Sequence, residues 1–411
     1  MKKRLLSLFI AALFPCHGVT AAQEPPPALT LPGILSEVRT GNPSLAAARR
    51  QLDLLEAEVT INSAYPNPSI ELDKAVSSGS DGYEVKVVQP VPLTRRAGTS
   101  EAAARAAFEA AQKELQALET VTLSAARKTW YALRIAKERR NFEETNLRFS
   151  MDILNKIEMR LQTGEAGNSD LARAKVETSR SGVHLLEAET TLRAAAGKLN
   201  MLMGRRPDAP AAVPENGGFS LAPAAPELEP LEKYTELALS RRSELRALAL
   251  NSRAAGLGMT LEKSRRLPVP EFGLIRGSDG STGYTRLFLG LELPLWYNNS
   301  GEIKRALANK ASLDYEARRL ELEIRGEVYN AWLELGLAQK RLAASRETVS
   351  LLNDLRRTAS QDYLSGKIDL TAFYETNRVF LEENVNYLDA LNEYYEKTAQ
   401  LEAAVNSGEE K

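Results

Sequence analysis

The chain contains an internal duplication in which the same order of residues returns after 202 positions. The matching pairs are Pro66 with Pro268, Pro68 with Pro270, Pro92-Leu93 with Pro294-Leu295, Trp130 with Trp332, Ala136 with Ala338, Arg139 with Arg341, and Thr163-Gly164 with Ser365-Gly366. Chance would not keep one spacing over so many unlike residues. We therefore predict two structural repeats, 30–204 and 231–405, joined by a linker at 205–230 that is rich in Pro and Gly.

Each repeat is predicted to contain a helix, a β-hairpin and two long helices, in that order. Prolines end the first helix, which covers 31–63 in one repeat and 231–265 in the other. Proline-free stretches rich in good helix formers follow at 99–162, 168–203, 302–364 and 369–405. A helix of about 60 residues is roughly 90–100 Å long, so it needs partners along its whole length.

A seven-residue spacing of mainly apolar side chains marks the last helix of each repeat. The positions are Phe373, Phe380, Tyr387, Tyr394 and Leu401, with the equivalents Leu171, Thr178, Leu185, Leu192 and Leu199. This spacing predicts coiled-coil packing of long helices. The alternative is a plain soluble helical bundle in which the stripe is only core, and the helices alone favour that alternative.

The predicted hairpins, 68–92 and 270–294, alternate apolar and polar residues in strands of about ten residues, the length that crosses an outer membrane. The candidate lipid-facing residues are Val85, Val87, Leu287, Leu289, Leu291 and Leu293. A hairpin half-buried on the helices is the alternative. Four strands cannot close a barrel, and open sheet edges leave backbone groups unpaired in lipid. If these strands span a membrane, several chains must share one barrel.

Residues 1–22 have the form of a signal peptide. A cationic start, Met1-Lys2-Lys3-Arg4, precedes an apolar run and small residues before Gln23. Cleavage before Cys16 with lipidation of that cysteine is the alternative, but Pro15 is a poor residue for such a site. In both cases we expect the protein to leave the cytoplasm.

Composition removes several classes of function. The chain has 53 basic and 54 acidic residues, which gives no electrostatic reason to bind nucleic acid. A mean hydropathy of −0.31 argues against a bundle of transmembrane helices. Once residues 1–22 are removed, no cysteine remains and His184 is the only histidine. We therefore expect no catalytic residue, no metal site and no cofactor, and His184, Trp130 and Trp332 are interpreted as structural residues.

These features together resemble the outer-membrane efflux proteins, the TolC-like family. The local motifs are Asn42-Pro43, Tyr65-Pro66-Asn67-Pro68, Gln89-Pro90-Val91-Pro92-Leu93, and a glycine at each helix tip, Gly164 and Gly366. The compact length and simple duplication are most similar to the cobalt–zinc–cadmium branch. The resemblance implies a mainly α fold with a small β part, in which three copies share a twelve-stranded transmembrane β-barrel continued by an α-barrel of coiled-coil helices.

The resemblance also implies a passive exit duct in the outer membrane with a periplasmic extension. Its expected partners are two further copies of the chain, a periplasmic adaptor, a proton-driven inner-membrane pump and outer-membrane lipid, with heavy-metal cations as one class of cargo. A different class of function stays open, namely a periplasmic coiled-coil scaffold or adaptor without a channel.

In this family the helix tips close the duct, which gives a candidate gate at Asp170, Tyr363 and Glu375. Ala372 replaces a second gate aspartate, and the position of the gate arginine falls at Ile368. The candidate adaptor-contacting tip residues are Gly164, Glu165, Ser169, Gly366, Lys367 and Asp369. Residue chemistry alone also allows Asp170 to be a helix cap and Glu375 to be a solvated surface charge.

Overall fold

The computed structural model describes residues 30–77, 80–92, 95–210, 221, 223, 226–279 and 282–406. The predicted signal peptide with Cys16, and a large part of the predicted linker, lie outside the described residues. The first repeat forms α1 (Leu31–Gly41), α2 (Pro43–Ser63), β1 (Ser69–Ser77), β2 (Ser80–Pro90), α3 (Arg96–Gln162) and α4 (Asn168–Leu202). The second forms α5 (Leu231–Arg241), α6 (Ser243–Ser264), β3 (Pro270–Asp279), β4 (Thr282–Leu291), α7 (Ser300–Leu364) and α8 (Leu370–Ala404). The predicted fold class, long helices with a small antiparallel sheet, is confirmed.

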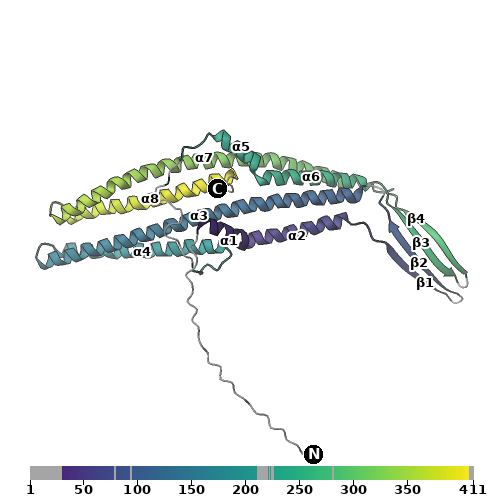
Figure 1. Ribbon diagram of the computed structural model, residues 1–411, viewed down its shortest axis with the longest axis horizontal. Coiled ribbons are helices and arrows are strands. Elements are labelled where there is room, and N and C mark those ends of the chain that lie inside the picture. Colours follow the sequence, from purple (N-terminus) through teal and green to yellow (C-terminus); the bar gives the residue numbers. More distant parts are fainter. Residues whose placement is uncertain are drawn as a thin grey trace, which may run out of the picture.

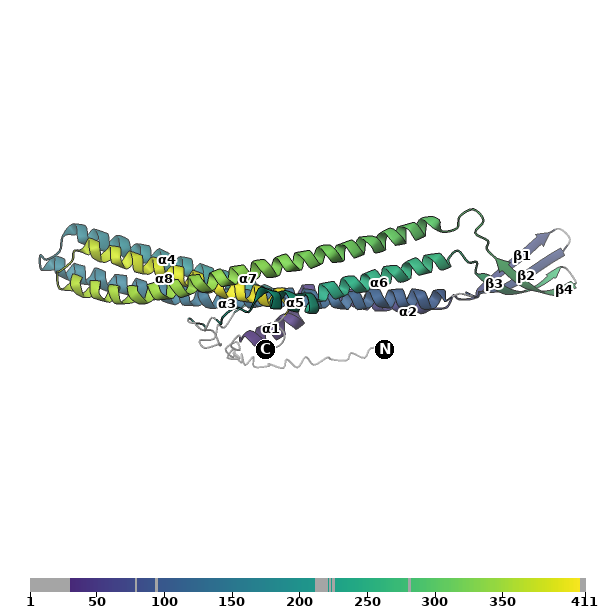
Figure 2. The same cartoon turned by 90° about the horizontal axis from the view of Figure 1, so that it is seen from above.

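The two repeats lie side by side as one long layer. In the half of the helical layer far from the sheet, α4 packs on α3, α3 on α8, and α8 on α7 (Figure 1). In the half next to the sheet the order is α2, α3, α6 and α7. The antiparallel sheet continues this sequence as β1-β2-β3-β4. Figure 2 shows the helix tips at one end of the molecule and the sheet at the other. One long edge therefore carries β1, α2 and α4, and the other carries β4 and α7.

The first helix of each repeat is broken, where the sequence predicted a continuous helix. The break at Asn42 follows from Pro43, which excludes helical backbone at the residue before it. Asn42 then caps α2, since its Oδ1 accepts hydrogen bonds from the backbone N–H of Ser44 and Leu45 at 3.0 and 3.2 Å. Arg242 has nearly the same backbone angles without a following proline. The second break therefore had no local signal of this kind.

The core lies between the long helices. Trp130 is 2% exposed in α3, and its neighbour Tyr131 stacks on Tyr395 of α8 with ring centroids 4.2 Å apart. Of the seven-residue series in α8, the members Phe373, Phe380, Tyr394 and Leu401 are buried. Trp332 is half-buried and its Nε1 donates to the carbonyl of Glu229 at 3.0 Å. The coiled-coil spacing thus marks the residues that join the helices.

Gly204 gives a stability prediction. Its φ is +76°, and a Cβ there would lie 2.2 Å from the carbonyl oxygen of Gly41, where α1 ends against α4. Left-handed backbone and overpacking together lead us to expect Gly204→Ala to lower the free energy of unfolding by roughly 2–5 kcal/mol. Gly164→Ala is the matched control, because φ is +78° but nothing lies within 4 Å of the added Cβ. Denaturation of both variants followed by circular dichroism checks this, and equal losses would contradict the contact with Gly41.

Candidate functional site at the helix tips

The two tips have the same backbone construction. Each long helix ends with a glycine of positive φ, Gly164 at +78° and Gly366 at +73°. In the first tip the N–H of Glu165 donates to the carbonyl of Arg160 at 2.8 Å, and in the second the N–H of Lys367 donates to Asp362 at 2.8 Å. This closing bond is the Schellman arrangement, which needs a residue that tolerates left-handed backbone. The duplication of the sequence therefore extends to the turn geometry.

Acidic side chains start the returning helices. The Oδ2 of Asp170 accepts from the N–H of Gly167 at 3.1 Å in the first tip. In the second, the Oδ1 of Asp369 accepts from the N–H of Ala372 at 2.7 Å. These carboxylates satisfy N–H groups that a helix start leaves unpaired. The predicted adaptor-contacting residues, Gly164, Glu165, Ser169, Gly366, Lys367 and Asp369, are all exposed.

Two of the three candidate gate residues lie close together. Tyr363 is buried at the end of α7 and stacks on Phe373, with ring centroids 5.3 Å apart. Burial raises the pKa of Tyr363, nearby Arg160 lowers it, and the charge of Asp170 raises it. The guanidinium of Arg160 lies over the Tyr363 ring, 5.6 Å from its centroid. Arg160 and Asp170 from the first repeat therefore meet Tyr363 from the second.

Glu375, the third candidate, lies apart from this cluster. Its carboxylate is exposed on α8 and pairs with Arg378 at 2.6 Å. The hydrogen bond from Arg378 is the main reason that the pKa of Glu375 lies below its ordinary value. Within one chain, Glu375 is a paired surface charge that does not contact Asp170 or Tyr363.

Sequence reasoning missed two arginines that connect the repeats. It sought a cation at Ile368 and Lys367, whereas Arg160 precedes the first turn. A basic residue in the last turn of α3, where a helix dipole favours one, was the available signal. The second is Arg356 of α7, whose Cζ lies 4.2 Å from the ring centroid of Phe149 and 4.3 Å from that of Phe380. Burial lowers the pKa of Arg356 to about 10.

At the opposite end, the sheet has one mainly apolar and one mainly polar face, with Arg276 opposite Val85 on the mainly apolar face. Val87 pairs with Leu274, and Leu274 pairs with Leu287, so these side chains share a face. Ile70, Leu72, Phe272 and Leu289 lie on the same face and are exposed. Val85, also on this face, is half-buried. Leu293 was predicted to be a strand residue, which is wrong. The strand β4 ends at Leu291, because its partner β3 begins at Pro270.

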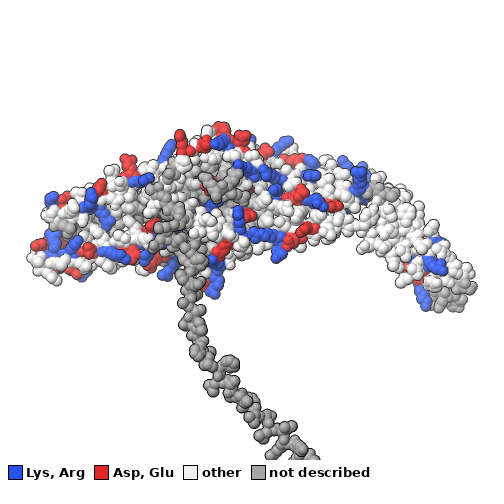
Figure 3. Space-filling model, in the orientation of Figure 1, with Lys and Arg blue, Asp and Glu red and all other residues white. Residues whose placement is uncertain are grey.

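Ion pairs occupy the other face of the sheet. Lys86 Nζ lies 3.0 Å from Glu71 Oε2, and Arg286 Nη2 lies 2.9 Å from Glu84 Oε2. Tyr284 also donates to Glu84 at 2.7 Å. On the side drawn in Figure 3, charges of both signs mix over the helices and are sparse on the part of the sheet next to them. Such a two-faced sheet fits lipid on one side and water on the other.

Two features are absent from the described part of the chain. No three side chains among its His, Cys, Asp and Glu residues are grouped so that they could hold a metal ion. None of its helices has an apolar stretch long enough to cross a membrane.

The fold, with long helices that end in duplicated tips and a sheet with one apolar face, is that of a TolC-like outer-membrane channel protein. Residues 235–407, within the second repeat and just beyond its end, match the model of the outer membrane efflux protein family. The family is one of efflux channels, and it assigns the chain to efflux and to the outer membrane. The resemblance indicated by the sequence is thereby confirmed.

Individual proteins resemble the chain over most of its length. The cobalt-zinc-cadmium resistance protein CzcC of Cupriavidus metallidurans is 23% identical over 392 residues, which cover 91% of this chain and 89% of CzcC. CusC, a transmembrane channel, superimposes with a TM-score of 0.77 at 14% identity over 92% of each chain. The open-state MtrE outer membrane channel of Neisseria gonorrhoeae has a TM-score of 0.75 at 17% identity and covers 92% of this chain and 88% of MtrE.

Proposed function

We propose that three copies of this chain form a passive exit duct through the outer membrane and the periplasm. An inner-membrane pump, driven by protons, delivers the cargo through a periplasmic adaptor that binds the helix tips. Because the similar protein CzcC is named for cobalt, zinc and cadmium resistance, we propose divalent heavy-metal cations as the cargo.

The observation that carries this proposal is the pair of complementary edges. Among the described strands, β1 and β4 each pair with one neighbour and are the ends of the sheet. An unpaired strand edge is not stable in lipid, so β4 of one copy needs β1 of the next. Three copies of a four-stranded sheet then close a barrel of twelve strands, which lies within the range of outer-membrane barrels.

The helical edges support the same head-to-tail contact. The α7 edge exposes Tyr315, Leu322 and Tyr329 at intervals of seven. These residues lie on the side of α7 away from the buried Ile324 and Val328, since each residue turns the helix by about 100°. The opposite edge exposes the apolar residues Leu54 and Ile61 of α2 and Val176, Val183 and Met201 of α4. Apolar surface at both edges favours burial in a ring of identical copies.

The junction of helices and sheet supports a membrane boundary at this point. Trp296 follows the sheet and is 98% exposed, while the adjacent Tyr297 is anchored by accepting from the N–H of Gly301 at 3.1 Å. Tyr65 is exposed at the same junction. Tryptophan and tyrosine are enriched at membrane–water interfaces.

The tip chemistry gives a test of the duct. The chain, purified in detergent, should run as a trimer and conduct ions in a planar bilayer. We expect Asp170→Ala with Glu375→Ala to raise single-channel conductance, because the candidate gate loses side chains that would hold the tips closed. The same change should lower cation preference, because carboxylate rings at a constriction attract cations. Asp369→Ala is the matched control, since it removes a cap at the other tip without changing a predicted gate residue.

A soluble monomer released from membranes by salt would contradict the duct and favour the periplasmic scaffold. A conducting trimer whose conductance is equal in both variants would instead leave Asp170 as a helix cap and Glu375 as a surface charge.

A further inference from the structure

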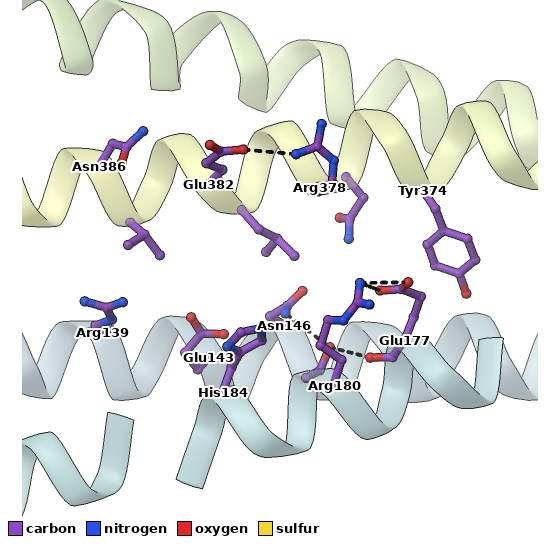
Figure 4. Close-up of a pocket in the computed structure, with 14 residues that line it drawn as sticks. Arg139, Glu143, Asn146, Glu177, Arg180, His184, Tyr374, Arg378, Glu382 and Asn386 are labelled. Carbon is purple, nitrogen blue, oxygen red and sulfur yellow. Dashed lines mark hydrogen bonds and ion pairs between the residues drawn. The ribbon is translucent and has the colours of Figure 1, made fainter. Parts of the chain in front are cut away.

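A cavity of about 300 Å³ lies between α3, α4 and α8 (Figure 4). Polar side chains from all three helices line it. Glu143 and Asn146 come from α3, His184 from α4, and Asn377 from α8. The cavity is built within one chain, so it does not depend on the proposed trimer.

Two buried amide groups have an oxygen without a partner. Asn146 is 2% exposed and Asn377 is 7% exposed, and the Oδ1 of each lacks a hydrogen bond among the described residues. Both residues line the cavity. A buried acceptor without a partner costs about 1–3 kcal/mol, so two at one cavity indicate that a hydrogen-bond donor or a cation belongs there.

Glu143 and His184 add two metal-ligand groups to the same wall. Glu143 is 6% exposed and has a side-chain hydrogen bond with Asn146. Burial raises its pKa, whereas the adjacent His184 and Arg139 lower it. The Nδ1 of His184 lies 3.4 Å from the carboxylate of Glu187, which leaves Nε2 as the free ring nitrogen. A carboxylate behind an imidazole is the usual outer-shell support of a metal-ligating histidine.

The arginines around the cavity have carboxylate partners of their own. Arg180 pairs with Glu177 at 3.2 Å, and Arg139 lies 3.5 Å from Asp389. Arg378 pairs with carboxylates at positions 375 and 382. These pairs offset the positive charge at the rim, and no arginine is paired with the Glu143 carboxylate in the described ion pairs.

We propose that this cavity binds one divalent transition-metal cation of the zinc and cobalt type. Glu143 and His184 Nε2 supply the carboxylate and imidazole ligands, the Oδ1 atoms of Asn146 and Asn377 supply oxygens, and water completes the shell. Imidazole with carboxylate suits such cations, whereas Mg²⁺ prefers oxygen ligands alone. Only two strong ligands come from the protein, so binding is weak and release is fast. The sequence missed this site because its four groups come from three helices, and it interpreted His184 as structural.

The test uses the full mature chain with an affinity tag that contains no histidine. CoCl₂ is titrated and followed by visible absorption, and ZnCl₂ then displaces it. We expect one Co²⁺ per chain, with His184→Ala and Glu143→Gln each weakening binding by at least about tenfold. Loss of outer-shell partners typically costs 10–100-fold in affinity, so Glu187→Gln should weaken binding within that range.

The matched control is Glu189→Gln, which removes a carboxylate from α4 that does not line the cavity and should leave binding unchanged. Circular dichroism shows that each variant is folded. Failure of the native chain to bind Co²⁺, or equal binding by all variants, would overturn the site. So would equal competition by MgCl₂. Bilayer conductance of the same preparations tests the duct separately from this site. Conduction without Co²⁺ binding would contradict only the proposed metal site, and Co²⁺ binding without conduction would contradict only the proposed duct.

Discussion

Leu322→Glu combined with Tyr329→Glu should convert the trimer into monomers and abolish conductance. Leu322 is 71% exposed and Tyr329 is 48% exposed in the single chain, so neither change disturbs the fold of one copy. In the proposed trimer both side chains would be buried against α2 and α4 of the next copy. Burying two such side chains contributes roughly 3–6 kcal/mol per interface, or about 10²–10⁴ in the association constant. Native mass spectrometry in detergent measures the loss directly.

The control is Leu307→Glu, the same substitution in the same helix. Leu307 is 56% exposed but lies outside the seven-residue series, about 80° around α7 from Tyr315. We expect this variant to stay trimeric and to conduct. If the double variant remained a trimer, or if the control dissociated as readily, the α7 stripe would not be the contact between copies.

The large elements were predictable because their signals are local. Proline-free stretches of helix formers predicted α3, α4, α7 and α8. The alternation of apolar and polar residues predicted both hairpins. The side-chain period of two also predicted which strand residues share a face, since a register shift of one would have mixed leucines with charges. The prediction that Leu293 lies in a strand was wrong because the length of a strand depends on its partner, and β3 has no residue opposite Leu293.

Contacts between the repeats could not be predicted, because their signals are not local. Arg160 and Tyr363 are separated by nearly half of the chain, yet they meet because α3 packs on α8, and α8 on α7. The Arg356 contact with Phe149 has the same origin. The break at Arg242 is a further case, since no proline follows it and tertiary packing against α7 fixes the backbone there, with Arg242 paired to Glu327 at 2.6 Å.

These cross-repeat contacts bear on how the tips can move. Arg356 holds α7 and α8 against α3, and the hydroxyl of Thr371 in α8 accepts from Arg173 of α4 at 2.5 Å. Both contacts lie within one chain. A movement of the tips that shifts whole copies relative to one another leaves these two contacts intact. A movement that separates α3 and α4 from α7 and α8 within one chain must break both contacts.

Leu287→Arg should destabilise the membrane-inserted trimer by roughly 2–4 kcal/mol per chain, the cost of an arginine at the lipid-facing midplane of a barrel. Leu287 is 90% exposed near the middle of β4, on the face shared with Val87 and Leu274. In a hairpin lying in water the same change would cost almost nothing. The measurement is guanidinium unfolding of the trimer in phospholipid vesicles, followed by tryptophan fluorescence.

The neighbouring residue provides the control. Phe288 lies on the opposite face of the sheet, where Lys86 Nζ is 4.7 Å from its ring centroid. We expect Phe288→Arg to leave the unfolding midpoint in vesicles nearly unchanged and to alter ion selectivity, because in the proposed barrel an arginine there would face the water-filled lumen. The two substitutions could instead lower the free energy of unfolding equally, or Phe288→Arg could lower it more. Either result would contradict the assignment of the leucine face to lipid and would indicate that this face packs against protein.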